Sequence, residues 1–170
     1  MRIFLDIGAH IGETLEEVLK EKYAFDRIIC FEPSKTCLKS LEKYSERDSR
    51  VEILQIGLSN ATCVQKLYNS GELNGSIFSD GESLDKNSES INLVDASAWY
   101  SENISEDDFV VIKTNCEGSE VKIVDSFLKG NTFEHFYSLL ITFDIRDYPS
   151  LAYQEIEIRK RLEATSFVNF

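Results

Sequence analysis

The sequence predicts an α/β fold, with a mostly parallel β-sheet and helices on both of its faces. Short apolar runs alternate with helix-periodic segments over about the first 55 residues, which is typical of parallel strands joined by crossover helices. The runs are continuously apolar, as expected for strands covered on both faces. With 170 residues, of which 42% are hydrophobic, a single domain over residues 1–170 can bury one core.

The first third of the chain supplies three strands and two helices. The strands are expected at Arg2–Ile7, Arg27–Phe31 and Val51–Ile56, and the helices at Thr14–Lys22 and Lys35–Glu46. In the first helix apolar residues recur at helical spacing, and Thr14 with Glu17 has the form of a capping box. We expect right-handed crossovers between these strands.

The middle of the chain is richer in turn-forming residues. Cys63–Tyr68 indicates one extra strand. Of the 22 residues of Asn69–Ser90, 14 are Ser, Gly, Asn or Asp, which predicts a long polar loop that is either functional or disordered. A short strand at Ile91–Val94 and a short helix at Ala96–Asn103 are expected to follow.

The last third returns to strong strand and helix patterns. The expected elements are a strand at Phe109–Lys113, a helix at Glu120–Leu128 capped by Gly130, a strand at Phe136–Phe143, a turn at Asp144–Pro149, a charged helix from about Ser150 to Ala164, and the start of a strand at Phe167–Phe170. We therefore expect the sheet to lack a complete C-terminal hairpin. The strand near residues 136–143 would then be under-covered, and a homodimer through this edge is an expected consequence.

Charge and cysteine content exclude several classes of protein. Asp and Glu number 30 against 18 Lys and Arg, and the resulting charge of −12 argues against nonspecific binding to nucleic acid or anionic lipid. No apolar run is long enough to span a bilayer. Asp6 interrupts the apolar residues at the start of the sequence, which leaves no hydrophobic region of a signal peptide there. The four cysteines show no C-x-x-C spacing and no His cluster, which favours reduced thiols without a metal site in a cytoplasmic protein.

Candidate functional residues follow the expected strands, because ligands of open α/β sheets bind outside the carboxyl ends of the strands. Four segments stand there: Asp6-Ile-Gly-Ala-His-Ile-Gly-Glu13, Phe31-Glu-Pro-Ser34, Gly57-Leu-Ser-Asn60 and Lys113-Thr-Asn-Cys-Glu-Gly-Ser-Glu120. Gly8 and Gly12 permit a sharp turn and the close approach of a ligand. Glu32 lies 24 residues after Gly8, a suitable distance for a carboxylate that binds a ribose diol.

These features fit a nicotinamide dinucleotide as well as S-adenosylmethionine, and charge discriminates between the two. A dinucleotide places a pyrophosphate against the turn, which favours three closely spaced glycines and no nearby acid. Here Asp6 and Glu13 flank the turn, and it holds two glycines. The pattern favours a ligand with a cationic amino group and a sulfonium.

Taken together, the four motifs resemble the FkbM-type methyltransferases over about residues 3–143. The resemblance implies a Rossmann-like class I methyltransferase fold, S-adenosylmethionine as cofactor, and methylation of an oxygen of a small molecule or saccharide. It places the methionine part of the cofactor against Asp6, Gly8 and Gly12, the ribose against Glu32, and the adenine near Ser59 or Asn60. His10 lies in the same turn and is a further candidate for contact with the cofactor. Lys113 and Glu117 would lie near the reacting centre, and Asn115 near the substrate. Asp144 follows the strand expected at Phe136–Phe143 at the same edge, where it either binds acceptor hydroxyls or belongs to a solvated turn.

The residues also suggest roles in the chemistry. Glu117 is the best candidate for the general base that accepts the hydroxyl proton, and Lys113 for stabilising developing negative charge or orienting the oxygen. We expect His10 to act in packing or in a hydrogen bond. Glu120 lies in the first turn of a helix, where the macrodipole explains a carboxylate.

Two departures from the family pattern keep other functions open. The family usually shows Lys-x-Asp-x-Glu-Gly, whereas this chain has Asn115 at the aspartate position. We also expect the end of the family's sheet to be absent, as in a minimal member, a fragment or a degenerate member of the family. A catalytically weak module that binds the nucleoside is therefore one alternative to an active enzyme. A nicotinamide-dependent oxidoreductase is a third reading, which the flanking acids disfavour.

Overall fold

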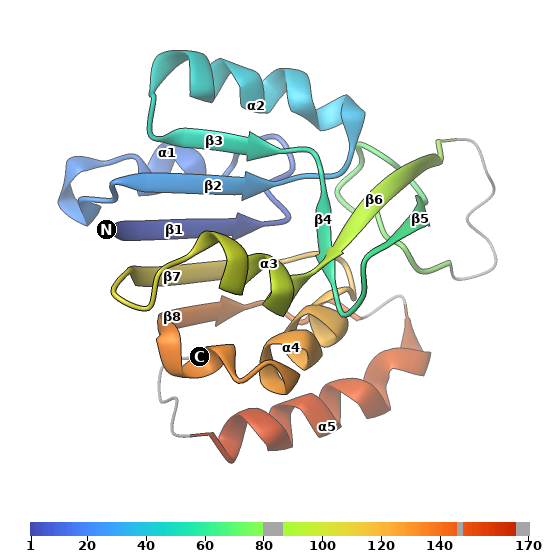
Figure 1. Cartoon of the computed structure of the whole chain (residues 1–170). Helices are drawn as coiled ribbons and strands as arrows, with labels where there is room; N and C mark the ends of the chain where they lie inside the picture. The colour runs from blue at the N-terminus through green and yellow to red at the C-terminus, as the bar shows by residue number, and fades with distance from the viewer. Residues whose placement is uncertain (80–86, 146–147, 166–170) are drawn as a thin grey trace.

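A five-stranded parallel sheet forms the centre of the fold (Figure 1). The computed structural model describes residues 1–79, 87–145 and 148–165. The strands of this main sheet are β1 (Arg2–Ile7), β2 (Arg27–Phe31), β3 (Val51–Leu54), β7 (Phe109–Thr114) and β8 (Phe136–Ile141). Their order is β3-β2-β1-β7-β8, so the chain winds outward in opposite directions from β1 and from β7. The predicted parallel α/β sheet is confirmed.

Helices cover both faces of the main sheet. Its helical elements are α1 (Leu15–Val18), η1 (Glu21–Tyr23), α2 (Lys35–Arg47), α3 (Ala96–Asn103), α4 (Glu120–Lys129), η2 (Thr132–His135), η3 (Pro149–Leu151) and α5 (Ala152–Glu163). Residues alternate between the faces along β1, so that Phe4 packs with α1 and α2 while Leu5 packs with α3 and α4. Helix α5 lies against α4 and adds Ile158 to the same side.

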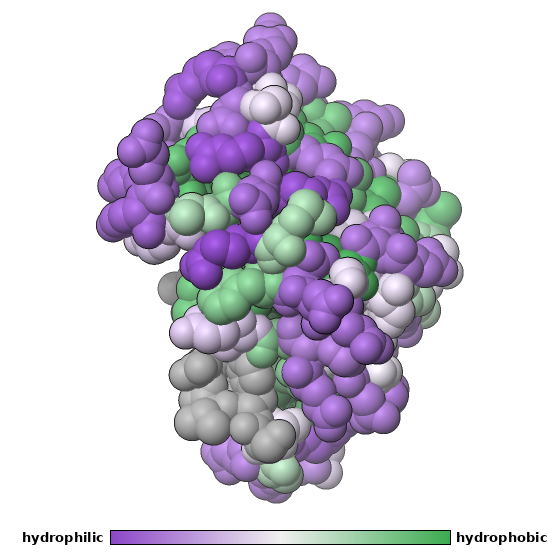
Figure 2. Space-filling model, turned by 60° about the vertical axis from the view of Figure 1, so that its left-hand side comes forward, coloured by the Kyte–Doolittle hydropathy of each residue, from purple (hydrophilic) through white to green (hydrophobic). Residues whose placement is uncertain are grey.

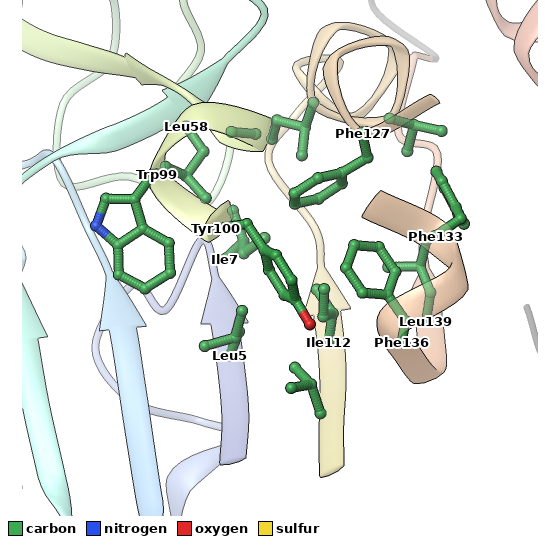
Figure 3. Close-up of a cluster of buried hydrophobic side chains, with 14 of the residues drawn as sticks. Leu5, Ile7, Leu58, Trp99, Tyr100, Ile112, Phe127, Phe133, Phe136 and Leu139 are labelled. Atoms are coloured by element: carbon green, nitrogen blue, oxygen red, sulfur yellow. The ribbon is translucent and has the colours of Figure 1, made fainter. Parts of the chain in front are cut away.

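Aromatic side chains dominate the core between the sheet and α3–α4 (Figure 3). Tyr100 and Phe127 meet Phe136 with ring centroids 4.9 and 5.0 Å apart, in edge-to-face arrangements. On the other side of Tyr100, Trp99 packs edge-on against Phe31 at 4.7 Å. This cluster fixes α3 and α4 on the sheet and thereby fixes the loop that joins β7 to α4.

A second, three-stranded sheet lies beyond the carboxyl ends of the main strands (Figure 1). It contains β4 (Gly57–Ser59), β6 (Glu89–Asp95) and β5 (Cys63–Leu67), in that order. The segment that the sequence places after the third strand itself forms β4, which pairs in parallel with β6. The strand predicted at 63–68 is confirmed, but it pairs antiparallel with β6, outside the main sheet.

Some helix boundaries also differ from expectation. The helix predicted over Thr14–Lys22 is only α1 followed by a 3₁₀ turn, and the side chain of Thr14 makes no capping bond. The chain leaves this segment through Ala24 in a left-handed conformation, which ends the helix. Gly130 ends α4 as predicted but keeps right-handed geometry, and the next residue, Asn131, takes the left-handed turn.

The structure describes the chain after β8 only in part. The main sheet gains no strand after β8 in the residues that the structure describes, and the strand predicted at Phe167–Phe170 lies outside them. In the same residues no helix has the length and apolar character needed to cross a membrane. On the face shown in Figure 2, hydrophilic residues cover most of the surface and hydrophobic ones fill smaller areas between them.

Candidate functional site

A cavity of about 480 Å³ lies at the carboxyl ends of β1, β2 and β7, between the main and second sheets. This is the point where the strand order reverses, the usual ligand site of doubly wound α/β folds. Its volume lies in the range of small-molecule sites. One wall is polar, and the other is apolar. The apolar wall comes largely from the second sheet and its loop: Leu58, Leu67, Leu73, Ile77, Ile91 and Leu93.

The turn after β1 forms the floor of the cavity. Gly8 and Gly12 have φ angles of 80° and 97°, which glycine adopts without strain. A Cβ atom on Gly8 would lie 2.2 Å from the carbonyl oxygen of Asn115, and one on Gly12 would lie 2.7 Å from the ring of Tyr44. The sequence predicts that these glycines let a ligand approach. The structure shows that each also lets another part of the chain approach.

Glu32 connects the end of β2 to this turn. Its side chain is 7% exposed, one oxygen accepts the backbone N–H of His10 at 2.8 Å, and the other accepts that of Ser34 at 2.8 Å. Burial raises the pKa of Glu32, and the two backbone donors oppose that rise. The carboxylate is thus held rigidly at the cavity wall.

The imidazole of His10 links the turn to the polar segment of residues 68–79. Its Nδ1 lies 2.7 Å from Oε1 of Glu13, and its Nε2 lies 3.4 Å from the carbonyl oxygen of Gly71. Burial lowers the pKa of His10, but the hydrogen bond and charge of Glu13 outweigh it and raise the pKa overall. Because both ring nitrogens face acceptors, the protonated ring satisfies both contacts. His10 thus connects the turn after β1 to the backbone of the polar segment.

Asp6 and Lys113 form a buried ion pair between β1 and β7. Asp6 is fully buried, and Nζ of Lys113 lies 2.9 Å from its Oδ1 while donating to the carbonyl oxygen of Gly8 at 2.9 Å. Among the described residues, neither oxygen of Asp6 accepts a well-formed hydrogen bond. Burial raises the pKa of Asp6 although the ammonium opposes this. The pair joins the two strands at the switch point.

The loop after β7 carries Glu117 into the cavity wall. Glu117 has a φ of 47° and Gly118 one of 93°, so two successive residues are left-handed. The hydroxyl of Ser76, in the polar segment opposite, donates to the carbonyl oxygen of Glu117 at 2.7 Å. Glu120, the first residue of α4, is fully buried and accepts backbone N–H groups of this loop from Cys116 and, at 2.9 Å, from Gly118.

The structure brings together most, but not all, of the predicted site residues. Those that line the cavity are Gly8, His10, Glu32, Lys113, Asn115 and Glu117. Asp6 lies behind Lys113, and Gly12 lies against Tyr44. Ser59 is buried in β4, outside the cavity lining, and Asp144 is half-buried after β8 and also outside it. Asn60 lies in a separate groove, with its amide nitrogen 3.5 Å from Oδ2 of Asp125.

Several cavity residues have no motif in the sequence that would mark them. The apolar residues of β5 and β6 reach the cavity only because the second sheet folds across the strand ends. Ser34 has a weak signal, since it follows Glu32-Pro33 and caps α2 by accepting the N–H of Thr36 at 3.2 Å. Across the described residues, no group of three or more His, Cys, Asp or Glu side chains is arranged to hold a metal ion.

Comparison with known proteins supports the fold. No family model matches the sequence, and no curated protein gives a significant match. Among solved structures, the chain is similar to the crystal structure of the methyltransferase FkbM from Methylobacillus flagellatus KT, with a TM-score of 0.58 and 18% identity. The alignment covers 96% of this chain and 38% of that one, so the chain spans well under half of its length. The shared fold agrees with the family resemblance of the four motifs.

Proposed function

We propose that the protein is an S-adenosylmethionine-dependent methyltransferase that methylates a hydroxyl oxygen of a small molecule or saccharide. The observation that carries this proposal is the buried carboxylate of Glu32, held by two backbone N–H groups at the cavity wall beside the glycine turn at the switch point. Lys113 is already paired with Asp6, so the floor of the cavity favours a cationic ligand over a diphosphate. The sulfonium and amino groups of S-adenosylmethionine meet this condition.

The residues present fit the cofactor. Each oxygen of Glu32 accepts one backbone N–H and keeps a lone pair for a ribose hydroxyl. The glycine turn, which Asp6 supports from behind through Lys113, would frame the methionine part. Leu67, Ile91 and Leu93, rather than Ser59 and Asn60, would form the wall along the adenine.

The chain's own residues would then orient and deprotonate the acceptor. S-adenosylmethionine, when bound, supplies an electrophilic methyl group on sulfur. Transfer of this methyl group to the acceptor oxygen would release S-adenosylhomocysteine and a methyl ether, and Glu117 would accept the hydroxyl proton. Holding the oxygen about 3 Å from the methyl carbon accounts for much of the rate. Lys113 would act by fixing the β1 turn through Asp6 and Gly8.

A nucleoside-binding module without strong catalysis is the second candidate. It is favoured by Lys113, whose ammonium contacts Asp6 and the carbonyl of Gly8 and is thus engaged away from a substrate oxygen. Asn115 at the cavity wall, in place of an acid, favours the same candidate.

Calorimetry with S-adenosylhomocysteine and with NAD tests the proposal. We expect binding of the first ligand and none of the second, followed by methyl transfer in an assay across sugars, glycolipids and polyketide alcohols. Binding without transfer to any acceptor would favour the module. Binding of NAD in preference to S-adenosylhomocysteine would overturn both.

A further inference from the structure

A fully buried carboxylate holds the loop that carries Glu117. Glu120 is the first residue of α4, and its side chain folds back along the chain to accept the N–H groups of Cys116 and Gly118. These two amides flank Glu117 on either side. A carboxylate placed for the helix macrodipole commonly stays exposed, whereas this one is withdrawn from water at a cost that its hydrogen bonds must offset.

The loop that Glu120 holds has a backbone geometry that needs support. Glu117 is left-handed, a conformation that is unfavourable for a residue with a Cβ. Gly118 continues the turn, and a Cβ there would lie 2.9 Å from Cδ1 of Leu151. Ser76, itself 1% exposed, holds the carbonyl side of Glu117. Hydrogen bonds therefore hold Glu117 on three sides: Ser76 binds its carbonyl oxygen, and Glu120 binds the backbone N–H groups of Cys116 and Gly118.

We propose that Glu120 is a positioning residue that sets the left-handed turn at Glu117 and Gly118 and thereby fixes Glu117 at the cavity wall. The inference deepens the proposed function, because Glu117 is the residue assigned there as the general base. It assigns to Glu120 a task beyond the helix macrodipole, which explains why the carboxylate is buried against the loop.

Amide hydrogen exchange followed by NMR gives the first test. Glu120→Gln keeps the size of the side chain and one acceptor oxygen. At pH 8, above the pKa of Glu120 of about 7, losing one charge-assisted bond should speed exchange at Cys116 or Gly118 about tenfold or more and should move the Cα shift of Glu117 away from its left-handed value. The matched control Glu163→Gln makes the same change at an exposed site of α5 and should leave these signals unchanged. Unchanged exchange in Glu120→Gln would overturn the proposal.

A double substitution separates positioning from ordinary structural support. Glycine adopts the left-handed conformation without strain, so in the Glu117→Gly protein the turn no longer needs the hydrogen bonds that Glu120 accepts. Glu120→Gln should therefore shift the urea midpoint less in the Glu117→Gly protein than in the unmodified protein. Equal shifts in both backgrounds would mean that Glu120 supports the helix alone, and would overturn the proposal.

Two further measurements keep the test decisive. If Glu120→Gln does not fold, Glu120→Asp keeps the charge on a shorter side chain and should release one of the two amides. The exchange rate of the Gly118 amide is also measured in the unmodified protein. If this amide exchanges as fast as the amides of exposed loops, the proposal is overturned, whichever variants fold. None of these measurements uses a ligand, so failure to bind S-adenosylhomocysteine would overturn the proposed function and not this inference.

Discussion

At the scale of single residues, Glu32 makes the most direct test of the cofactor site. Glu32→Ala removes a charged acceptor from two ribose hydroxyls, and we expect S-adenosylhomocysteine binding to weaken by roughly 1–3 kcal/mol. Calorimetry measures this, with circular dichroism to confirm folding, because the substitution also frees the N–H groups of His10 and Ser34. Unchanged affinity in a folded variant would remove Glu32 from the site.

Asn115 tests whether the departure from the family pattern limits catalysis. Asn and Asp are nearly isosteric, so Asn115→Asp adds a negative charge to the cavity wall without changing its packing. We expect methyl transfer to rise, by up to the roughly 10²–10⁴-fold that acid–base assistance supplies, while affinity for S-adenosylhomocysteine changes little. The rate is measured with an acceptor that the unmodified protein methylates. If the rate does not rise, Asn115 is only a residue of the turn.

At the scale of elements, Gly8 allows the turn after β1 to pack closely against the loop after β7. Its φ is 80°, and a Cβ atom added there would lie 2.2 Å from the carbonyl oxygen of Asn115, which leaves no room for alanine. We expect Gly8→Ala to lower the free energy of unfolding by more than about 2 kcal/mol, because strain and a backbone clash add. Gly75→Ala is the matched control, since its Cβ would lie 3.2 Å from its nearest neighbours. Similar urea midpoints for both variants would contradict this expectation.

The outer strand of the main sheet sets a second expectation at this scale. Among the described residues β8 ends the sheet, and its side chains Tyr137 and Leu140 are 58% and 54% exposed. Because such an edge can pair with another chain, we expect a concentration-dependent dimer in sedimentation experiments. Leu140→Lys should shift the equilibrium toward the monomer. A monomer at high concentration in the unmodified protein would contradict the expectation.

At the scale of the whole molecule, buried acids should make stability fall as pH rises. Burial raises the pKa of Asp6 and Glu32, and it raises that of Glu120 to about 7 while the backbone N–H donors oppose the rise. Each group binds its proton more tightly in the folded state, so its contribution is present at low pH and is lost as pH rises through the folded pKa. For Glu120 the loss falls between about pH 4.5 and 7 and amounts to roughly 3 kcal/mol.

Urea unfolding from pH 4.5 to 8 measures this fall. In Glu120→Gln the side chain does not titrate, so most of the fall in the free energy of unfolding between about pH 4.5 and 7 should disappear. Asp48 acts in the opposite direction at lower pH, because the hydrogen bond from Arg50 lowers its pKa to about 2 and its contribution is lost as pH falls through that value. A profile that stays equally steep in Glu120→Gln would assign the fall to other groups.

The sequence by itself determined the succession of strands and helices along the chain and the residues at the strand ends. Continuous apolar runs and helical periodicity are local signals, and they marked β1, β2, α2, α3, β7, α4 and β8 within a few residues. The motifs after β1, β2 and β7 supplied most of the polar cavity wall, because parallel strands bring their carboxyl ends to one edge.

Only the tertiary structure decided how the cavity is closed and held. The pairing of β4 with β6, the apolar wall from β5 and β6, and the burial of Glu120 against the loop before it depend on contacts between distant segments. The same holds for Gly8, whose closest neighbour is Asn115, more than 100 positions along the chain. Local patterns record whether a residue is apolar, charged or flexible; they do not record which distant backbone it meets, and that contact sets its role.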